Sequence, residues 1–138
     1  MSTIRTGRCA CGAVRIEARG DPVAELHCQC RHCQLRSGTG HSSFLVFAGP
    51  EAVELNGETR SWSVTADSGN EKYQAFCPDC GTPTHMTFPA NPDVTAISAA
   101  LLDSPDQFAP KFVTYAGRAL PWDSLDPVLA RFDQMPKG

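Results

Sequence analysis

Two short cysteine motifs, Cys9-Ala10-Cys11-Gly12 and Cys77-Pro78-Asp79-Cys80-Gly81, decide what kind of fold this sequence encodes. Each motif holds two thiols close together and follows the second with a glycine, which can adopt the positive φ of a knuckle around a metal. Two knuckles supply four thiolates, enough to close a tetrahedral zinc site. We therefore expect a structural zinc bound by four sulfurs: Cys9, Cys11, Cys77 and Cys80.

The two knuckles are separated by 65 residues, 12–76, so that metal binding would close a long loop. The entropic cost of such a closure grows only logarithmically with loop length. Removing the metal should therefore loosen the whole fold. Buried free thiols or a disulfide are the alternative reading, and iron could replace zinc because four thiolates suit both ions. The paired spacing favours a metal.

A further motif, Cys28-Gln29-Cys30-Arg31-His32-Cys33, places three thiols within six residues. Three protein ligands leave one tetrahedral position open, which is the pattern of catalytic zinc sites rather than structural ones. An incoming thiol could take that position and become a thiolate, because the metal stabilises deprotonated sulfur. We expect Cys28, Cys30 and Cys33 to bind a second zinc ion at which the chemistry occurs.

Several alternatives stay open at this second site. The fourth ligand could be one of four histidines: His27, His32, His41 and His85. Otherwise the histidines would be polar neighbours that orient the site. The three thiols could also bind metal weakly or oxidise to a disulfide once metal is lost. Arg31 and Arg36 could attract an anionic substrate or form a solvated face.

Short strands joined by tight turns account for most of the remaining sequence. Residues 13–19 alternate between apolar and polar side chains, which is the period of a half-buried strand. Val53–Leu55 and Arg60–Val64 flank Asn56-Gly57 and predict a hairpin, because Asn-Gly suits a turn with positive φ. Further strands are expected at 23–27, 43–47, 72–76, 84–88, 94–98 and 111–115.

Two segments are helix-compatible. Residues 30–36 lack strand alternation and end at Ser37-Gly38, which predicts one or two helical turns. Residues 126–132 predict a C-terminal helix with Pro127 in its first turn. The predicted fold class is therefore mainly β, with one or two short helices.

Composition limits the classes of function. A length of 138 residues suits one domain, 1–138, and seven cysteines, an odd number, favour metal thiolates over disulfides. The net charge of -3 and the lack of a basic run argue against nucleic acid as a partner. Neither a signal peptide nor an apolar stretch near the ~20 residues of a membrane span is present. We expect a cytoplasmic protein without a membrane partner.

The three cysteine motifs in this order, with Leu120-Pro121-Trp122 near the C-terminus, resemble the glutathione-dependent formaldehyde-activating family, which includes the domain of centromere protein V. The resemblance covers nearly the whole chain. It implies a β-tent fold of several short antiparallel sheets with two zinc ions, the second site being open to partial occupancy. It assigns the structural zinc to Cys9, Cys11, Cys77 and Cys80, and the catalytic zinc to Cys28, Cys30 and Cys33.

The same resemblance implies a reaction. The family joins formaldehyde and glutathione to S-hydroxymethylglutathione, or reverses that step, as a carbon-sulfur lyase. One position departs from the commoner pattern, because Gln29 stands where a histidine often lies between the first two cysteines. That departure puts the proton transfer and the particular substrate in question.

Two hypotheses follow. The first is a zinc-dependent enzyme that acts on a thiol, with glutathione as the leading candidate, or on its carbonyl adduct. The second is a zinc-stabilised binding module without catalysis on the same scaffold. A methionine sulfoxide reductase on a similar scaffold would need another nucleophilic cysteine, and all seven are assigned. The sequence leaves the general acid or base and the oligomeric state open.

Overall fold

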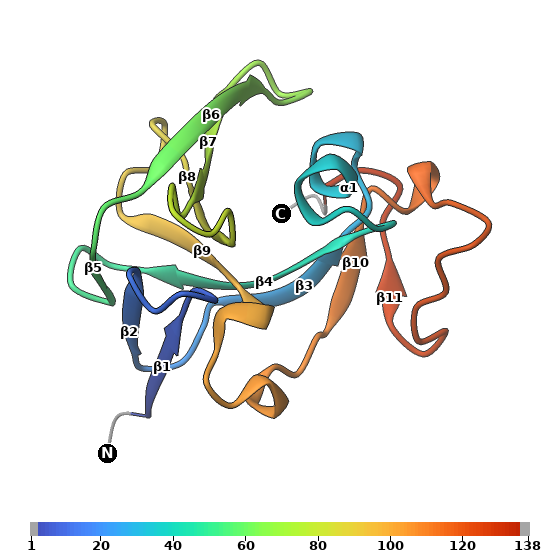
Figure 1. Ribbon diagram of the computed structural model, residues 1–138. Coiled ribbons are helices and arrows are strands. Elements are labelled where there is room, and N and C mark those ends of the chain that lie inside the picture. The colour runs from blue at the N-terminus through green and yellow to red at the C-terminus, as the bar shows by residue number, and fades with distance from the viewer. Residues whose placement is uncertain (1–2, 136–138) are drawn as a thin grey trace.

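Two β-sheets form the protein, which is described by a computed structural model over residues 3–135 (Figure 1). The smaller sheet is antiparallel with strand order β1-β2-β5, and the larger sheet has the order β11-β10-β3-β4-β9-β8-β7-β6. Antiparallel pairing holds throughout, except that β10 runs parallel to both β3 and β11. The strands are β1 (Ile4–Arg8), β2 (Arg15–Arg19), β3 (Ala24–Cys28), β4 (Ser42–Ala48), β5 (Val53–Asn56), β6 (Arg60–Thr65), β7 (Glu71–Phe76), β8 (Pro83–Thr87), β9 (Val94–Ser98), β10 (Phe112–Thr114) and β11 (Ala130–Arg131).

One α-helix, α1 (Arg31–Ser37), lies among these strands in the described part of the chain. It begins after Cys30, whose sulfur accepts a hydrogen bond from the Cys33 N–H, and it ends at Gly38 with φ 75°. Three short 3₁₀ turns complete the elements: η1 (Ala99–Leu101), η2 (Pro105–Gln107) and η3 (Ala116–Arg118). The prediction of a mainly β fold with one or two short helices is confirmed.

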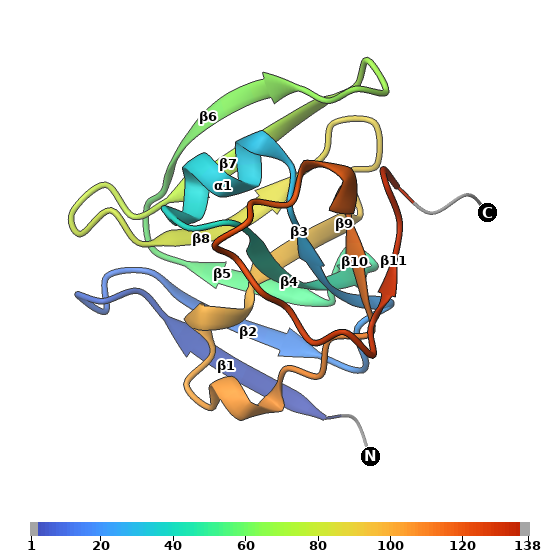
Figure 2. The ribbon, with the colours of Figure 1, turned by 90° about the vertical axis from the view of Figure 1, so that its right-hand side faces the viewer.

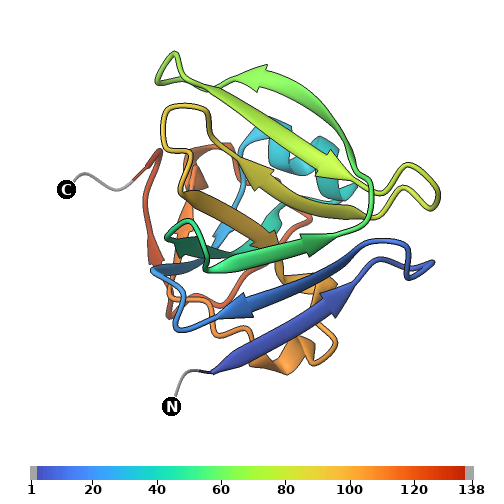
Figure 3. The same cartoon turned by 90° about the vertical axis from the view of Figure 1, so that its left-hand side faces the viewer.

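The two faces of the larger sheet contribute to different buried clusters, because successive side chains of a strand point to opposite sides. On β4, Leu45 and Phe47 are buried in a core shared with β2, whereas Phe44 belongs to a second buried cluster with Cys28 and Met86. Figures 2 and 3 show the β1-β2 hairpin beneath the larger sheet. Helix α1 lies on the opposite side, where β6, β7 and β8 rise away from β3 and β4 (Figure 1). None of the helices within residues 3–135 is long and apolar enough to cross a membrane.

The expected hairpin around Asn56-Gly57 is wrong. Strand β5 pairs with β2 in the smaller sheet, and β6 pairs with β7 in the larger sheet, so the intervening residues cross between sheets. Gly57 does have a positive φ of 105°. Glycine is needed at position 57 for a second reason as well, because an added Cβ would collide with the backbone carbonyl of Ala13.

The expected C-terminal helix over 126–132 is also wrong. The Asp126 carboxylate accepts from the Val128 N–H at 3.0 Å and the Asp126 carbonyl accepts from the Leu129 N–H at 3.2 Å, which together close a turn over residues 126–129. The chain then forms β11, and the Phe132 N–H donates to the Val113 carbonyl at 2.9 Å. The exposed edge of β10 therefore offers this segment better backbone partners than an isolated helical turn could.

Candidate metal centres

The first cluster brings together Cys9, Cys11, Cys77 and Cys80, whose sulfurs lie within 4.8 Å of one another. Two turns carry them, one between β1 and β2 and the other between β7 and β8. Figure 3 shows both turns at the same edge of the molecule. Cys9 and Cys77 are buried, whereas Cys11 and Cys80 are exposed. The cluster thus joins the smaller sheet to the larger one.

The two turns are built alike. In the first, the Gly12 N–H donates to the Cys9 carbonyl at 3.0 Å, and in the second the Gly81 N–H donates to the Cys77 carbonyl at 2.8 Å. Both glycines have positive φ, 81° for Gly12 and 79° for Gly81, as their place after each cysteine pair predicts. Thr82 links the turns: its hydroxyl accepts from the Ala10 N–H at 3.1 Å.

The sulfur spacing fits a tetrahedral ion. Cys9 Sγ lies 3.6 Å from Cys11 Sγ, and Cys11 Sγ lies 3.7 Å from Cys77 Sγ. Four sulfurs at about 2.3 Å from one zinc would be separated by about 3.8 Å, whereas a disulfide would bring two of them to about 2.05 Å. All seven cysteines are free thiols in this structure. The donor set therefore fits a four-thiolate metal rather than a disulfide.

The second cluster consists of Cys28, Cys30 and Cys33, all buried, with their sulfurs also within 4.8 Å of one another. Cys28 ends β3, Cys30 caps helix α1 and Cys33 lies in its first turn. The change from strand to helix therefore aims three side chains at one point. A strand alone would place Cys28 and Cys30 on one face and Cys33 on the other.

Positive charge lies beside this second cluster. Lys72, on β7, is 9% exposed, and its ammonium lies 3.8 Å from Cys30 Sγ. Hydrogen bonds from the neighbouring thiols, aided by Lys72, lower the pKa of Cys30. The pKa values of Cys28 and Cys33 are raised, chiefly because they are hydrogen-bonded to other cysteines of the cluster. A metal bound by all three sulfurs must therefore displace protons.

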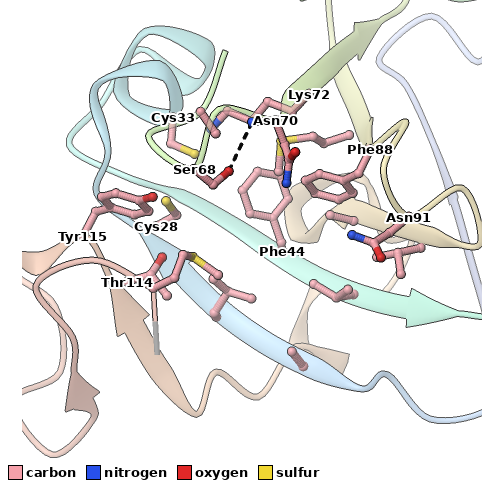
Figure 4. Close-up of a pocket in the computed structure, with 18 of the residues that line it drawn as sticks. Cys28, Cys33, Phe44, Ser68, Asn70, Lys72, Phe88, Asn91, Thr114 and Tyr115 are labelled. Atoms are coloured by element: carbon pink, nitrogen blue, oxygen red, sulfur yellow. Dashed lines mark hydrogen bonds between the residues drawn. The ribbon is translucent and has the colours of Figure 1, made fainter. Parts of the chain in front are cut away.

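A cavity of about 370 Å³ opens beside the cluster and is lined in part by Cys28 and Cys33. Figure 4 shows Cys28, Cys33 and Tyr115 at one end of it and Phe88 and Asn91 at the other. A smaller cavity, which Lys72 also lines, is lined in part by Cys30 and His32. The cluster is thus buried within the protein but reachable from two cavities.

Tyr115 lines both cavities. It is the non-glycine residue with positive φ among residues 3–135, at 54°, and the Arg118 guanidinium lies 5.6 Å from the centre of its ring. In Figure 4 its hydroxyl points toward Cys28. Burial raises the pKa of Tyr115, as do the charges of Asp67 and the cysteines, so the hydroxyl keeps its proton. Nothing in the sequence marks Lys72 as a neighbour of the cluster, and the positive φ of Tyr115 leaves no mark in the sequence.

No histidine of the described residues joins the three sulfurs. Three of them have other partners: His27 contacts Ser43 at 2.7 Å, His41 contacts Asp123 at 3.0 Å, and His85 contacts Thr84 at 2.9 Å. Burial lowers the pKa of both His27 and His85 to about 4, so both are neutral at pH 7. His27, His41 and His85 are thus each held by another polar side chain.

The two arginines near the cluster differ from each other. Arg36 does not form a solvated face, because its guanidinium lies 4.7 Å from the centre of the Phe44 ring and donates to the Ser98 hydroxyl. Arg31 is exposed and donates to the Gln34 side chain at 3.2 Å. Neither arginine lines the larger cavity.

Fold and clusters together define a β-rich protein with two cysteine sites suited to metal ions. A family model described as glutathione-dependent formaldehyde-activating enzyme (GFA) matches residues 4–118, and the chain belongs to this family. A crystal structure of a Rhodobacter sphaeroides protein is similar over 92% of this chain and 98% of that chain, with a TM-score of 0.57. At 18% identity that similarity concerns the fold alone. The comparison with curated proteins gives no match.

Proposed function

We propose that the protein is a zinc-dependent carbon-sulfur lyase that makes or breaks the bond between a thiol and a carbonyl compound such as formaldehyde. Membership in the GFA family supports a reaction of this class. The observation that carries the proposal is the position of three buried cysteines, apart from the other four, beside a cavity that two of them, Cys28 and Cys33, line. We further propose that it acts in the cytoplasm as one domain, 1–138.

The ligand sets are part of the proposal. Cys9, Cys11, Cys77 and Cys80 would hold a structural zinc, and Cys28, Cys30 and Cys33 would hold the second. A zinc ion on three thiolates supplies an open coordination position at which a substrate thiol is stabilised as its thiolate. Three thiolates exceed the charge of a divalent ion by one, and the Lys72 ammonium beside Cys30 offsets that excess.

Tyr115 would supply the proton. In the forward direction the thiolate sulfur forms a bond to the carbonyl carbon, and the carbonyl π pair moves to oxygen. The Tyr115 hydroxyl, which keeps its proton and faces the same cavity as Cys28, donates that proton to the oxygen. The proton that the thiol released to solvent on becoming a thiolate then returns from solvent to the phenolate and restores the phenol. The reverse sequence cleaves the adduct to free thiol and aldehyde.

Metal content and exchange kinetics test this proposal together. Elemental analysis should find two zinc ions per chain in the native protein and one in Cys28→Ala. NMR exchange between ¹³C-formaldehyde, a thiol and their adduct should be accelerated by the native protein and not by the variant. If the native protein binds two zinc ions but accelerates the exchange of no thiol tested, the enzyme hypothesis is refuted. That result would support the alternative, a non-catalytic zinc-stabilised binding module.

A further inference from the structure

The cavity beside the second cluster has an apolar floor formed by one face of the larger sheet. On β3, Ala24, Leu26 and Cys28 share that face because they are two residues apart. The register sets Phe44 opposite Leu26 and Val46 opposite Ala24 on β4. Strands β9 and β8 continue the floor with Ala96 opposite Met86, and Phe112 on β10 lies beside Leu26.

The apolar floor begins at the cluster and leads away from it. Ala24 lies four residues before Cys28, which at about 3.3 Å per residue is about 13 Å along the strand. A molecule whose sulfur reaches the cluster would therefore lay the rest of its length along this floor. The volume of about 370 Å³ lies near the lower end of the range for small-molecule sites.

Charged groups are scarce in the lining. Glu71 and Lys72 are the charged residues among those that line the cavity, and Lys72 is already directed to Cys30. Glutathione carries two carboxylates and an ammonium, and burying an unpaired charge is costly. The remaining polar side chains near the mouth, Ser68, Asn70 and Asn91, are exposed and neutral. The lining therefore lacks the cationic groups that glutathione would need.

We propose that the thiol substrate of this site is a small neutral thiol with an alkyl or aryl body, together with its aldehyde adduct. The inference rests on the proposed function, because it takes the second cluster as the place where sulfur binds. The apolar body lies over Leu26, Phe44 and Met86, and the sulfur lies beside Cys28. The site then selects its substrate mainly by burying apolar area, which contributes about a fourfold gain in affinity for each methylene.

Calorimetric titration of the zinc-loaded protein tests the inference. The probes are ethanethiol, butanethiol, hexanethiol and octanethiol, with glutathione and hexan-1-ol as comparisons. The dissociation constant should fall about fourfold per methylene, and glutathione should bind at least tenfold more weakly than hexanethiol. Glutathione binding as tightly as hexanethiol would overturn the inference and leave the proposed function standing. Hexan-1-ol binding as tightly as hexanethiol would overturn both, because sulfur would then play no part.

A pair of variants tests where the alkyl group of the bound thiol lies. Ala24 is half-buried at the far end of the floor, so Ala24→Leu should shorten the cavity. We expect octanethiol to bind at least tenfold more weakly to this variant and ethanethiol to be unaffected. Ala100→Leu is the control, because Ala100 is an exposed residue of η1 outside the lining, and it should change neither constant. Equal losses for both thiols in Ala24→Leu, or no loss for octanethiol, would refute the proposed path.

Discussion

Replacing Lys72 by methionine should weaken zinc binding at the second cluster and leave the first cluster unchanged. The Lys72 side chain is buried, and its ammonium lies 3.8 Å from Cys30 Sγ. A divalent ion on three thiolates has a net charge of minus one, and Lys72 is the cation in contact with that group. Methionine keeps the length and apolar character of the side chain and removes the charge.

The size of the effect follows from the distance. Two unit charges 3.8 Å apart attract by about 4 kcal/mol at an effective dielectric constant near 20. Burial of the ammonium costs several kcal/mol, which offsets part of that attraction. A net loss of about 1–3 kcal/mol remains, which is a rise of about 5- to 150-fold in the zinc dissociation constant.

A competition titration against a chromophoric zinc chelator measures this constant and separates the two sites by affinity. Lys72→Arg should restore most of the binding, and Lys111→Met, at an exposed position, should have no effect. Circular dichroism confirms that each variant is folded. A folded Lys72→Met protein that binds two zinc ions as tightly as the native protein would show that this charge does not support the cluster.

Three further predictions test other parts of the structure. Circular dichroism should show Cys77→Ala to be unfolded at 25 °C. A structural zinc contributes about 10–16 kcal/mol of binding free energy to folding, and the net free energy of unfolding of a domain is only about 5–15 kcal/mol. A cooperative urea transition like that of the native protein would contradict this. Tyr115→Phe should lower kcat for adduct exchange by about 10²- to 10⁴-fold while two zinc ions stay bound, and an unchanged kcat would exclude the hydroxyl as proton donor. Gly57→Ala should lower the free energy of unfolding in urea by several kcal/mol, because the added Cβ would strike the Ala13 carbonyl. The control Gly69→Ala, at φ 88° in open space, should lower it by only about 1 kcal/mol. Equal losses in the two variants would mean that the close contact at Gly57 relaxes freely.

The knuckles could be predicted from sequence because their determinants are local. A cysteine pair followed by glycine defines a turn within five residues, and both Gly12 and Gly81 adopt the positive φ that this requires. The helical turns over 30–36 were equally local, since Cys30 caps α1 and Gly38 ends it. Most strands were also found, because alternation or a short apolar run identifies them without knowledge of their partners.

The wrong predictions concern pairing between distant segments. Asn56-Gly57 has the backbone expected of a turn, yet its flanking strands join different sheets, which no local pattern encodes. Strand β1 was not predicted, because its residues offer little apolar alternation. Gly7 is the buried residue of β1: a Cβ there would meet the Leu101 carbonyl, so the strand packs by close backbone approach rather than by side chains.

Gln29 bears on where substrate selection lies. Its side chain is 1% exposed, lines neither cavity, and donates to the Asp123 carboxylate at 3.4 Å. Asp123 in turn contacts His41 at 3.0 Å. A residue at position 29 therefore supports the second cluster from behind and does not touch a molecule in the cavity. Gln29 thus belongs to a polar network with Asp123 and His41, whereas the apolar face of β3 and β4 decides which thiol can reach the cysteines.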